Sequence, residues 1–232
     1  MLVSQQNISL PEEQRATSLG DLQLFKLLLQ PHFLFNSLNN IYALSVKRSD
    51  LTTEAIAGLS ELLENVVACS RQEYIPLTQE LKLVEDYIRL ERIWLGETSF
   101  LLDFQVSGDT SNFLLPPLVL YTFVENCFKH GIRKCAGDGW LTIKVEVKKG
   151  TLYFSAKNLV PKWAETSDSG TERSGFGIEA AKELLKRKCK GNHELSTGRK
   201  GNVFTVKLKI ACPENSEQED NEPAYRMKKL YK

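Results

Sequence analysis

Apolar residues recur three or four positions apart along two stretches near the start of the chain. Between residues 21 and 46 they are Leu24, Leu27, Leu28, Leu34, Phe35, Leu38, Ile41 and Tyr42. From Leu51 to about Ser70 the same spacing runs through Ile56, Leu59, Leu62, Leu63, Val66 and Val67. This period is that of one buried face of an amphipathic helix. The pattern predicts two helices joined by a short turn at 47–50, and therefore an antiparallel hairpin.

Such a hairpin cannot bury both of its apolar faces within one chain. Pairing with the same hairpin of a second chain would form a four-helix bundle with a continuous core. The pattern therefore favours a homodimer.

The rest of the chain mixes helical and strand-like patterns. Helices are predicted at about 79–95, 117–130 and 178–188, and strands at Phe100–Val106, Leu141–Val147, Leu152–Ala156 and Val203–Ile210. Lys149 and Gly150 mark a hairpin turn between the middle two strands. The sequence thus predicts an α+β fold, in which the N-terminal helical hairpin precedes an α/β sandwich with helices on one face of a sheet.

Composition divides the chain into four predicted segments. Residues 1–20 are polar and periodless, which is typical of a linker. Residues 21–74 form the helical region, and 75–212 form the sandwich. Residues 213–232 are acidic and then basic, which predicts a flexible tail.

Charge and apolar content exclude several classes of protein. The 30 Lys and Arg against 29 Asp and Glu give a net charge of +1, which does not favour a nucleic-acid partner. No apolar run approaches the ~20 residues of a membrane span, and the first residues lack the pattern of a signal peptide. The five cysteines are scattered, matching neither a zinc site nor a disulfide scaffold. We therefore expect a soluble chain with reduced thiols in the cytoplasm.

One histidine stands out on the polar side of the first predicted helix. His32 shares this side with Asn36, Asn39 and Asn40, so its imidazole is expected to face outward. Pro31 directly before it would kink a helix interior. A lone helical histidine is more often an ordinary solvated residue, and the residue types alone leave that interpretation open.

The longer motif around this histidine is more specific. The run PHFLFNSLNNI resembles the phosphoacceptor segment of the LytS-like sensor histidine kinases, whose pattern is approximately QxxPHFLFNxLNxI. Pro31 to Asn36 match without interruption, and Leu38, Asn39 and Ile41 continue the register. The resemblance implies that His32 accepts a phosphoryl group from ATP, that Asn36 orients its imidazole, and that the chain dimerises through these helices.

A second constellation lies in LPPLVLYTFVENCFKHGI, where Glu125, Asn126, Lys129 and His130 fall in the last turns of an apolar helix. A carboxamide oxygen suits Mg²⁺, and a lysine one turn later supplies charge for phosphates. The alternative is an ordinary polar helix end, in which Lys and His offset the helix dipole and Gly131 stops the helix.

This run resembles the N-box of the Bergerat-type ATPase fold, in the LytS-like form PxxLQPLVENAxKHG. The matching residues are Val124, Glu125, Asn126, Lys129, His130 and Gly131, whereas Tyr121 and Thr122 replace the Gln and Pro of the pattern. The resemblance implies binding of ATP and Mg²⁺, with Asn126 as a metal ligand and with Lys129 and His130 beside the nucleotide.

Two further features fit an ATP site of this family. Gly175 and Gly177 precede a helix whose N-terminus offers amides to a phosphate, and they resemble its second glycine box. The stretch from Asn158 to Gly175 would then be a lid over ATP. Asn158 stands where the family usually has the adenine-reading aspartate of a DxGxG box; it keeps an acceptor oxygen but lacks the charge, and Val160 and Lys162 replace the glycines.

The resemblance implies the catalytic core of a two-component sensor histidine kinase. His32 would attack the γ-phosphorus of ATP and pass the phosphoryl group to an aspartate of a response-regulator receiver domain. Phe33 occupies the position after the histidine where many kinases have an acidic residue, so Glu125 is the candidate base, provided that the ATP domain docks beside the helix. The input would come from an N-terminal membrane sensor absent from this chain, which would be the cytoplasmic part; the alternative is a soluble protein that receives signals from a partner. The altered DxGxG box leaves one alternative, a non-catalytic dimerisation and nucleotide-binding module of the same fold.

Overall fold

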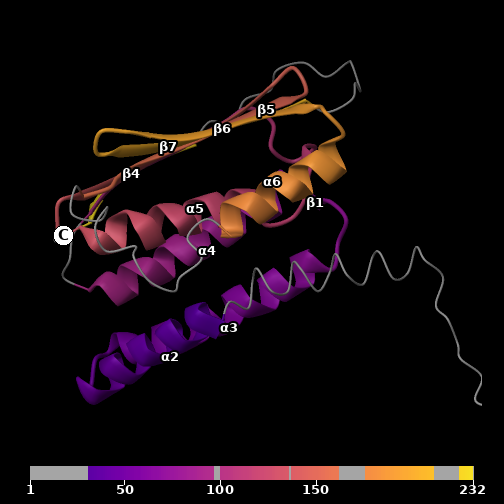
Figure 1. Cartoon of the computed structure of the whole chain (residues 1–232). Helices are drawn as coiled ribbons and strands as arrows, with labels where there is room; N and C mark the ends of the chain where they lie inside the picture. Colours follow the sequence, from indigo (N-terminus) through magenta and orange to yellow (C-terminus); the bar gives the residue numbers. More distant parts are fainter. Residues whose placement is uncertain (1–30, 97–99, 136, 162–175, 212–224, 232) are drawn as a thin grey trace, which may run out of the picture.

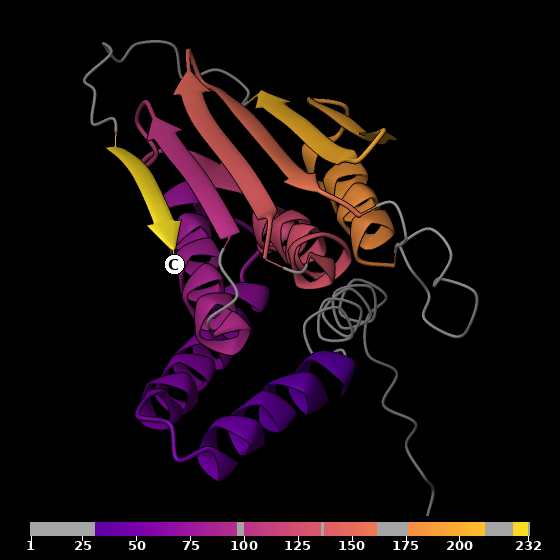
Figure 2. The ribbon, with the colours of Figure 1, turned by 90° about the vertical axis from the view of Figure 1, so that its left-hand side faces the viewer.

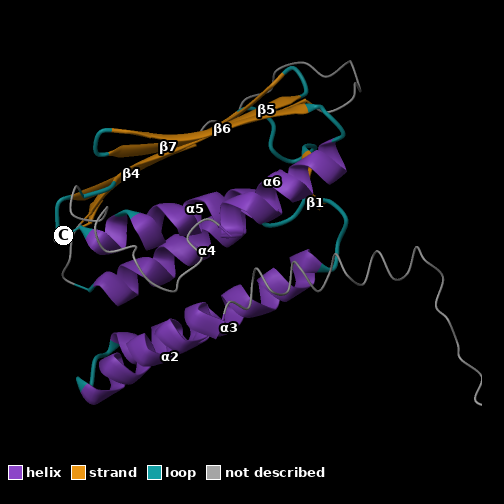
Figure 3. Cartoon of the chain, in the orientation of Figure 1, coloured by secondary structure: helices purple, strands orange, loops and turns teal. Residues whose placement is uncertain are grey.

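The computed structural model describes residues 31–96, 100–135, 137–161, 176–211 and 225–231, which form three layers (Figure 1). A sheet forms the first layer, α4, α5 and α6 cover one of its faces, and α2 and α3 pack below these helices. The helices are α2 (Pro31–Val46), α3 (Leu51–Ser70), α4 (Leu77–Leu95), α5 (Val119–His130) and α6 (Phe176–Cys189). The predicted α+β class, with a helical hairpin followed by a sandwich, is confirmed (Figure 3).

The main sheet has the strand order β6-β7-β5-β4-β2-β8. Its members are β2 (Phe100–Ser107), β4 (Gly139–Lys148), β5 (Thr151–Leu159), β6 (His193–Lys200), β7 (Val203–Ala211) and β8 (Tyr225–Tyr231). Only the β2–β4 pair is parallel. A short 3-10 turn at Ile132–Lys134 follows α5, and β1 (Ile75–Pro76) pairs with β3 (Leu114–Leu115) apart from the main sheet.

The predicted hairpin between β4 and β5 is confirmed. Lys149 and Gly150 form its two-residue turn, with φ of 48° and 67°. Two positive φ angles match a tight turn to the twist of the strands it joins. Along β5 every second residue then faces the helices, and Leu152, Phe154 and Ala156 are buried there.

Two strands differ from the sequence predictions. β6 was not predicted, because its alternating positions are mostly polar and only Leu195 packs against the core. Tyr225–Tyr231, within the segment predicted as a flexible tail, forms β8 along the free edge of β2 (Figure 2). Antiparallel pairing satisfies backbone groups that this edge would otherwise leave open.

The core lies between the sheet and its helices and continues under α4 toward α3. Its largest fully buried side chains include Tyr87, Phe104, Phe123 and Phe128. α4 buries a wide apolar surface, because it packs against α5 on one side and α3 on the other. Among the described helices none is long and apolar enough to cross a bilayer.

Candidate ATP site and phosphoacceptor helix

α5 changes character halfway along its length. Its residues from Val119 to Val124 are buried, whereas Glu125, Asn126, Lys129 and His130 are partly exposed. The predicted polar group therefore gathers at the C-terminal half of one helix. Its exposure leaves these side chains able to meet a ligand while the rest of α5 is held in the core.

A glycine joins this helix end to the sheet. At Gly131 an added Cβ would lie 1.8 Å from Asn158 Nδ2 and 2.7 Å from the Leu159 carbonyl oxygen. No side chain fits such a gap. Gly131 therefore lets the end of β5 approach the end of α5, and it brings Asn158 beside the N-box residues.

Asn158 is a buried polar residue at the end of the helix-facing row of β5. It is 1% exposed, and its Nδ2 donates a hydrogen bond to the Leu159 carbonyl oxygen at 3.0 Å. Its Oδ1 is buried and has no hydrogen-bond partner in the described part of the chain. A buried acceptor without a donor is costly, so this oxygen fits a ligand that brings an N–H group, such as the amine of adenine.

The glycine box is only partly described. Gly177 lies in the first turn of α6, where an added Cβ would be 3.3 Å from Thr122 Cγ2. The start of α6 therefore lies against the first half of α5. Gly175 and the predicted lid beyond Pro161 lie outside the described residues.

A carboxylate of α4 holds the start of α5, although the sequence analysis did not single it out. Glu80 of α4 is fully buried and accepts hydrogen bonds from the backbone N–H groups of Leu118 (2.7 Å) and Tyr121 (2.9 Å) at the start of α5. Burial raises the pKa of Glu80 to about 7 despite these bonds. Burial also raises the pKa of Glu125 to about 7, although Lys129 and Arg133 oppose the rise. A carboxyl group that titrates near neutral pH suits proton transfer.

A buried ion pair lies next to Glu125. Both oxygens of the Glu91 carboxylate, from α4, accept hydrogen bonds from Arg133, the Nε bond being 2.9 Å. The Arg133 guanidinium also lies 5.8 Å from the centroid of the Trp94 ring. Glu80 and Glu91 are carboxylates within the apolar face of a predicted helix, and this was the available sequence signal for them. Their partners could not be identified from the sequence, because they lie about forty positions away.

The phosphoacceptor motif lies at the start of α2, and its apolar residues use two different faces. Phe33 is 7% exposed and packs against α4, with Leu34 and Ile41 partly buried beside it. Phe35, Leu38 and Tyr42 are exposed by 65%, 57% and 71%, so the apolar residues predicted from the helical spacing are only partly buried within one chain. The backbone of His32 belongs to α2, Asn36 is partly exposed, and the imidazole of His32 lies outside the described side chains.

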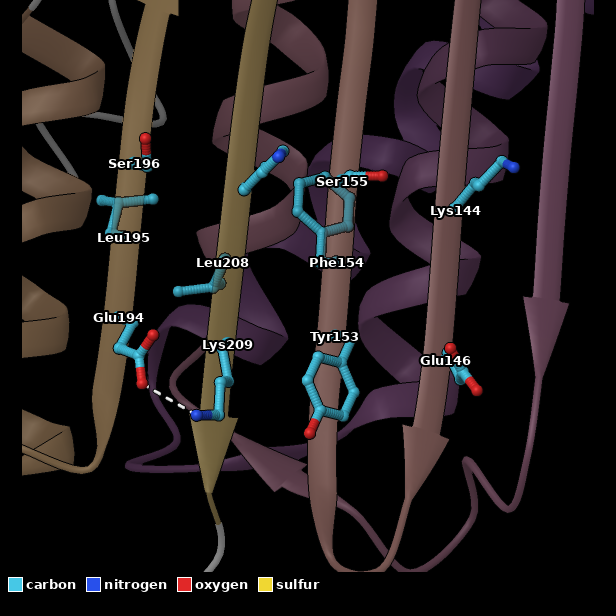
Figure 4. Close-up of a pocket in the computed structure, with 11 residues that line it drawn as sticks. Lys144, Glu146, Tyr153, Phe154, Ser155, Glu194, Leu195, Ser196, Leu208 and Lys209 are labelled. Atoms are coloured by element: carbon cyan, nitrogen blue, oxygen red, sulfur yellow. Dashed lines mark hydrogen bonds and ion pairs between the residues drawn. The ribbon is translucent and has the colours of Figure 1, made fainter.

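A hollow also lies on the open face of the sheet. Figure 4 shows this shallow hollow among side chains of β4, β5, β6 and β7, where Lys209 pairs with Glu194 at 2.8 Å. Tyr153 and Ser155 in it alternate with the residues of β5 that face α5. The hollow is therefore on the opposite side of the sheet from the N-box, and we do not assign it to the nucleotide.

Comparisons with known proteins find similarity to histidine kinases. Residues 21–99 match the family model described as Histidine kinase. The sensor histidine kinase YpdA of Escherichia coli is 30% identical over 146 residues, which cover 62% of this chain and 26% of YpdA. The sensor protein LytS of Staphylococcus haemolyticus is 31% identical over 133 residues, covering 56% of this chain and 23% of LytS. The chain is related to the LytS-like sensor histidine kinases.

This relationship confirms the resemblance drawn from the phosphoacceptor motif and the N-box. The chain spans about a quarter of the length of these two curated relatives. Among solved structures, the histidine kinase domain of the blue-light activated kinase EL346 from Erythrobacter litoralis aligns with a TM-score of 0.43 and 14% identity. It covers 86% of this chain and 94% of the domain.

Proposed function

We propose that this chain is the catalytic core of a two-component sensor kinase, which phosphorylates its own His32 from ATP and passes the group to an aspartate of a response-regulator receiver domain. One observation supports the proposal most. The unpartnered buried oxygen of Asn158 lies at the end of the helix that carries Asn126 and Lys129, in a chain whose α2 begins with the phosphoacceptor motif.

The proposed division of labour follows the sequence segments. Residues 21–74 would provide the phosphoacceptor and the dimer contacts, and residues 75–212 would bind ATP. Asn158 would accept a hydrogen bond from the adenine amine. Lys129 and His130, together with Gly177 in the first turn of α6 and with Gly175, would hold the phosphates.

The residues present also fit a magnesium ion. Asn126 lies on the partly exposed half of α5, and a carboxamide oxygen is a hard ligand of the kind Mg²⁺ binds. Bound there, Mg²⁺ would offset phosphate charge during transfer. The protein's own task is then to hold the nucleotide and the imidazole in line.

The transfer step assigns one role to each group. The lone pair of an imidazole nitrogen of His32 forms an N–P bond as the bond from the γ-phosphorus to the β–γ bridging oxygen breaks, and ADP leaves. The proton on the other imidazole nitrogen passes to the Glu125 carboxylate. Asn36, one helical turn after His32, would orient the ring.

The exposed apolar stripe of α2 supports a homodimer. Phe35, Leu38, Tyr42 and Val46 follow one another at helical spacing, and each is more than half exposed in the single chain. Contiguous apolar surface of this kind marks an interaction site. A second copy of the hairpin would cover it in a four-helix bundle.

The names of the relatives identify them as sensors, and they are much longer than this chain. By analogy, the chain would be the cytoplasmic part of an inner-membrane sensor, with its input domain N-terminal to the phosphoacceptor helix. No nucleic-acid partner is proposed, in keeping with the net charge of +1.

The altered DxGxG box favours one other candidate function, a degenerate module that binds nucleotide and dimerises without transferring phosphate. Incubation with γ-labelled ATP and Mg²⁺ separates the two candidates. Label on wild type but not on His32→Gln supports the kinase, with Asn126→Ala losing both nucleotide binding and label. Nucleotide binding with no label on wild type supports the module.

A further inference from the structure

Phe33, the residue that follows the phosphoacceptor histidine, connects α2 to the ATP-binding part of its own chain. Its ring centroid lies 6.4 Å from that of Tyr87 and 6.0 Å from that of Trp94, both on α4. One turn later, Ser37 is fully buried, and its hydroxyl donates to the Phe33 carbonyl oxygen at 2.8 Å. The phosphoacceptor end of α2 is therefore anchored through this ring.

The anchor leads directly to the N-box helix. The Tyr87 ring meets Tyr121 of α5 edge-on at 5.3 Å, and Tyr121 lies one turn before Glu125. The charged side chains that act on Tyr87 are Glu91, Arg133 and Glu125. Phe33 is thus separated from the surroundings of Glu125 by a single side chain.

The second contact of Phe33, with Trp94, also leads to the surroundings of Glu125. Trp94 lies beneath the Arg133 guanidinium, which pairs with Glu91 and is among the charges that act on Glu125. Two routes through packed side chains therefore join the start of α2 to the surroundings of Glu125, one through Tyr121 near the start of α5 and one through Arg133 just after its end. Packed aromatic contacts hold a defined geometry, which flexible surface contacts do not.

We propose that Phe33 is a positioning residue that docks the phosphoacceptor segment on the ATP domain of the same chain, so that phosphoryl transfer runs within one chain. The proposal rests on the proposed kinase function and adds to it the direction of transfer. The bond changes are those given above, with His32, Glu125 and the bound ATP all belonging to one protomer.

Kinetics of Phe33 variants test the positioning role. Phe33→Ala should lower the rate of autophosphorylation at saturating ATP by at least about tenfold, because small displacements of a nucleophile cost large factors in rate. The ATP concentration at half-maximal rate should not change, and Phe33→Met, which keeps most of the apolar bulk, should restore most of the rate.

Tyr153→Ala is the control, because it removes an aromatic ring that is 43% exposed on the open face of the sheet, away from the N-box and from the apolar stripe of α2. The positioning role of Phe33 predicts that this variant labels at nearly the wild-type rate. Equal losses in Phe33→Ala and Tyr153→Ala, or a change only in the ATP requirement, would overturn the positioning role.

Heterodimers with two affinity tags test the direction of transfer. In a dimer of one His32→Gln chain and one Asn126→Ala chain, each chain lacks one half of the reaction, so transfer within a chain predicts no label. A dimer of wild type with the double variant should label, and this shows that mixed dimers are competent. Label on the Asn126→Ala chain would refute transfer within one chain.

Amide hydrogen exchange does not depend on enzyme activity, so it tests the docking of Phe33 separately from the proposed kinase function. Phe33→Ala should speed amide hydrogen exchange in residues 33–40 and leave β7 unchanged, whereas Tyr153→Ala should leave exchange at Phe33 and Ser37 unchanged. If the wild type carries no phosphohistidine, the proposed kinase function is wrong. The exchange measurement still tests whether Phe33 docks α2 on α4. Unchanged exchange in Phe33→Ala would overturn the docking in either case.

Discussion

At the scale of single residues, Gly131 lets the end of α5, which carries the N-box residues, lie close to Asn158 at the end of β5. An added Cβ would lie 1.8 Å from Asn158 Nδ2, 2.6 Å from the Cys127 carbonyl oxygen and 2.7 Å from that of Leu159. Two of these neighbours are backbone atoms, which cannot rotate away. We expect Gly131→Ala to destabilise the fold by about 1–3 kcal/mol and to weaken nucleotide binding, since Asn158 must move.

The control for this prediction is Gly198→Ala on β6, where an added Cβ meets nothing within 4 Å. Denaturant unfolding and nucleotide titration of both variants provide the comparison. A Gly131→Ala protein as stable as Gly198→Ala, with unchanged nucleotide affinity, would show that the close approach of β5 to α5 is not needed.

The raised pKa of Glu125 predicts a pH dependence of autophosphorylation. Glu125 can accept a proton only when ionised, and burial raises its pKa to about 7, against Lys129 and Arg133 and with Glu91 adding to the rise. The rate should therefore increase with pH through about 7. Glu125→Gln should lose about 10²–10⁴-fold in rate, as expected when a general base is removed.

The informative quantity is the difference between the pH profiles of the wild type and Glu125→Gln. Part of the rise should vanish in Glu125→Gln while its affinity for nucleotide stays close to that of wild type. Superimposable profiles with similar rates would exclude Glu125 as the base.

Sequence reasoning identified the motif residues of the site but not the residues that support them. Asn126, Lys129 and His130 are neighbours on one helix, so their shared exposure follows from spacing. The bonds from Glu80 to the start of α5 and from Glu91 to Arg133 join positions about forty residues apart. A single sequence gives no measure of such pairings, because they depend on how α4 packs against α5.

At the scale of elements, α2 has one apolar face that packs within the chain and one that is exposed. Phe33 and the partly buried Leu34 and Ile41 pack within the chain, whereas Phe35, Leu38, Tyr42 and Val46 remain exposed. Helical spacing predicted the helix but could not divide these residues between faces, because the two faces overlap in the pattern.

The exposed face predicts how the dimer can be broken. Leu38→Asp combined with Tyr42→Asp should convert the dimer to a monomer at tens of micromolar protein, because burying two carboxylates in an apolar interface is strongly unfavourable. Light scattering with sedimentation measures the mass, and circular dichroism should show the sandwich still folded.

Asn39→Asp is the matched control, since it adds a charge to the same helix at an exposed position outside the apolar stripe. It should remain dimeric. A wild-type chain that is already monomeric, or an aspartate pair that leaves the dimer intact, would contradict the assignment of this face to the dimer.

The sheet shows the limits of pattern reading for strands. β2, β4, β5 and β7 alternate between core and solvent and were predicted from that alternation. β6 is an edge strand that buries little, and β8 is held by its backbone pairing with β2. A strand specified by a neighbour's open edge has little sequence signal of its own.

At the scale of the whole molecule, α4 unites the layers. It packs against α3 and α5 and contacts α2 through Tyr87 and Trp94. Its buried carboxylates bind the start of α5 and the Arg133 side chain beyond its end. The phosphoacceptor helix and the ATP-type sandwich are therefore mechanically connected within one chain.

The central claim is that His32 is phosphorylated from ATP, and the chemical nature of the label tests it most directly. After incubation with γ-labelled ATP and Mg²⁺, wild-type protein should carry a label that is stable in alkali and lost in acid, as expected of an N–P bond. His32→Gln should bind nucleotide normally and carry no label. A label that is stable in acid and persists in His32→Gln would contradict the account.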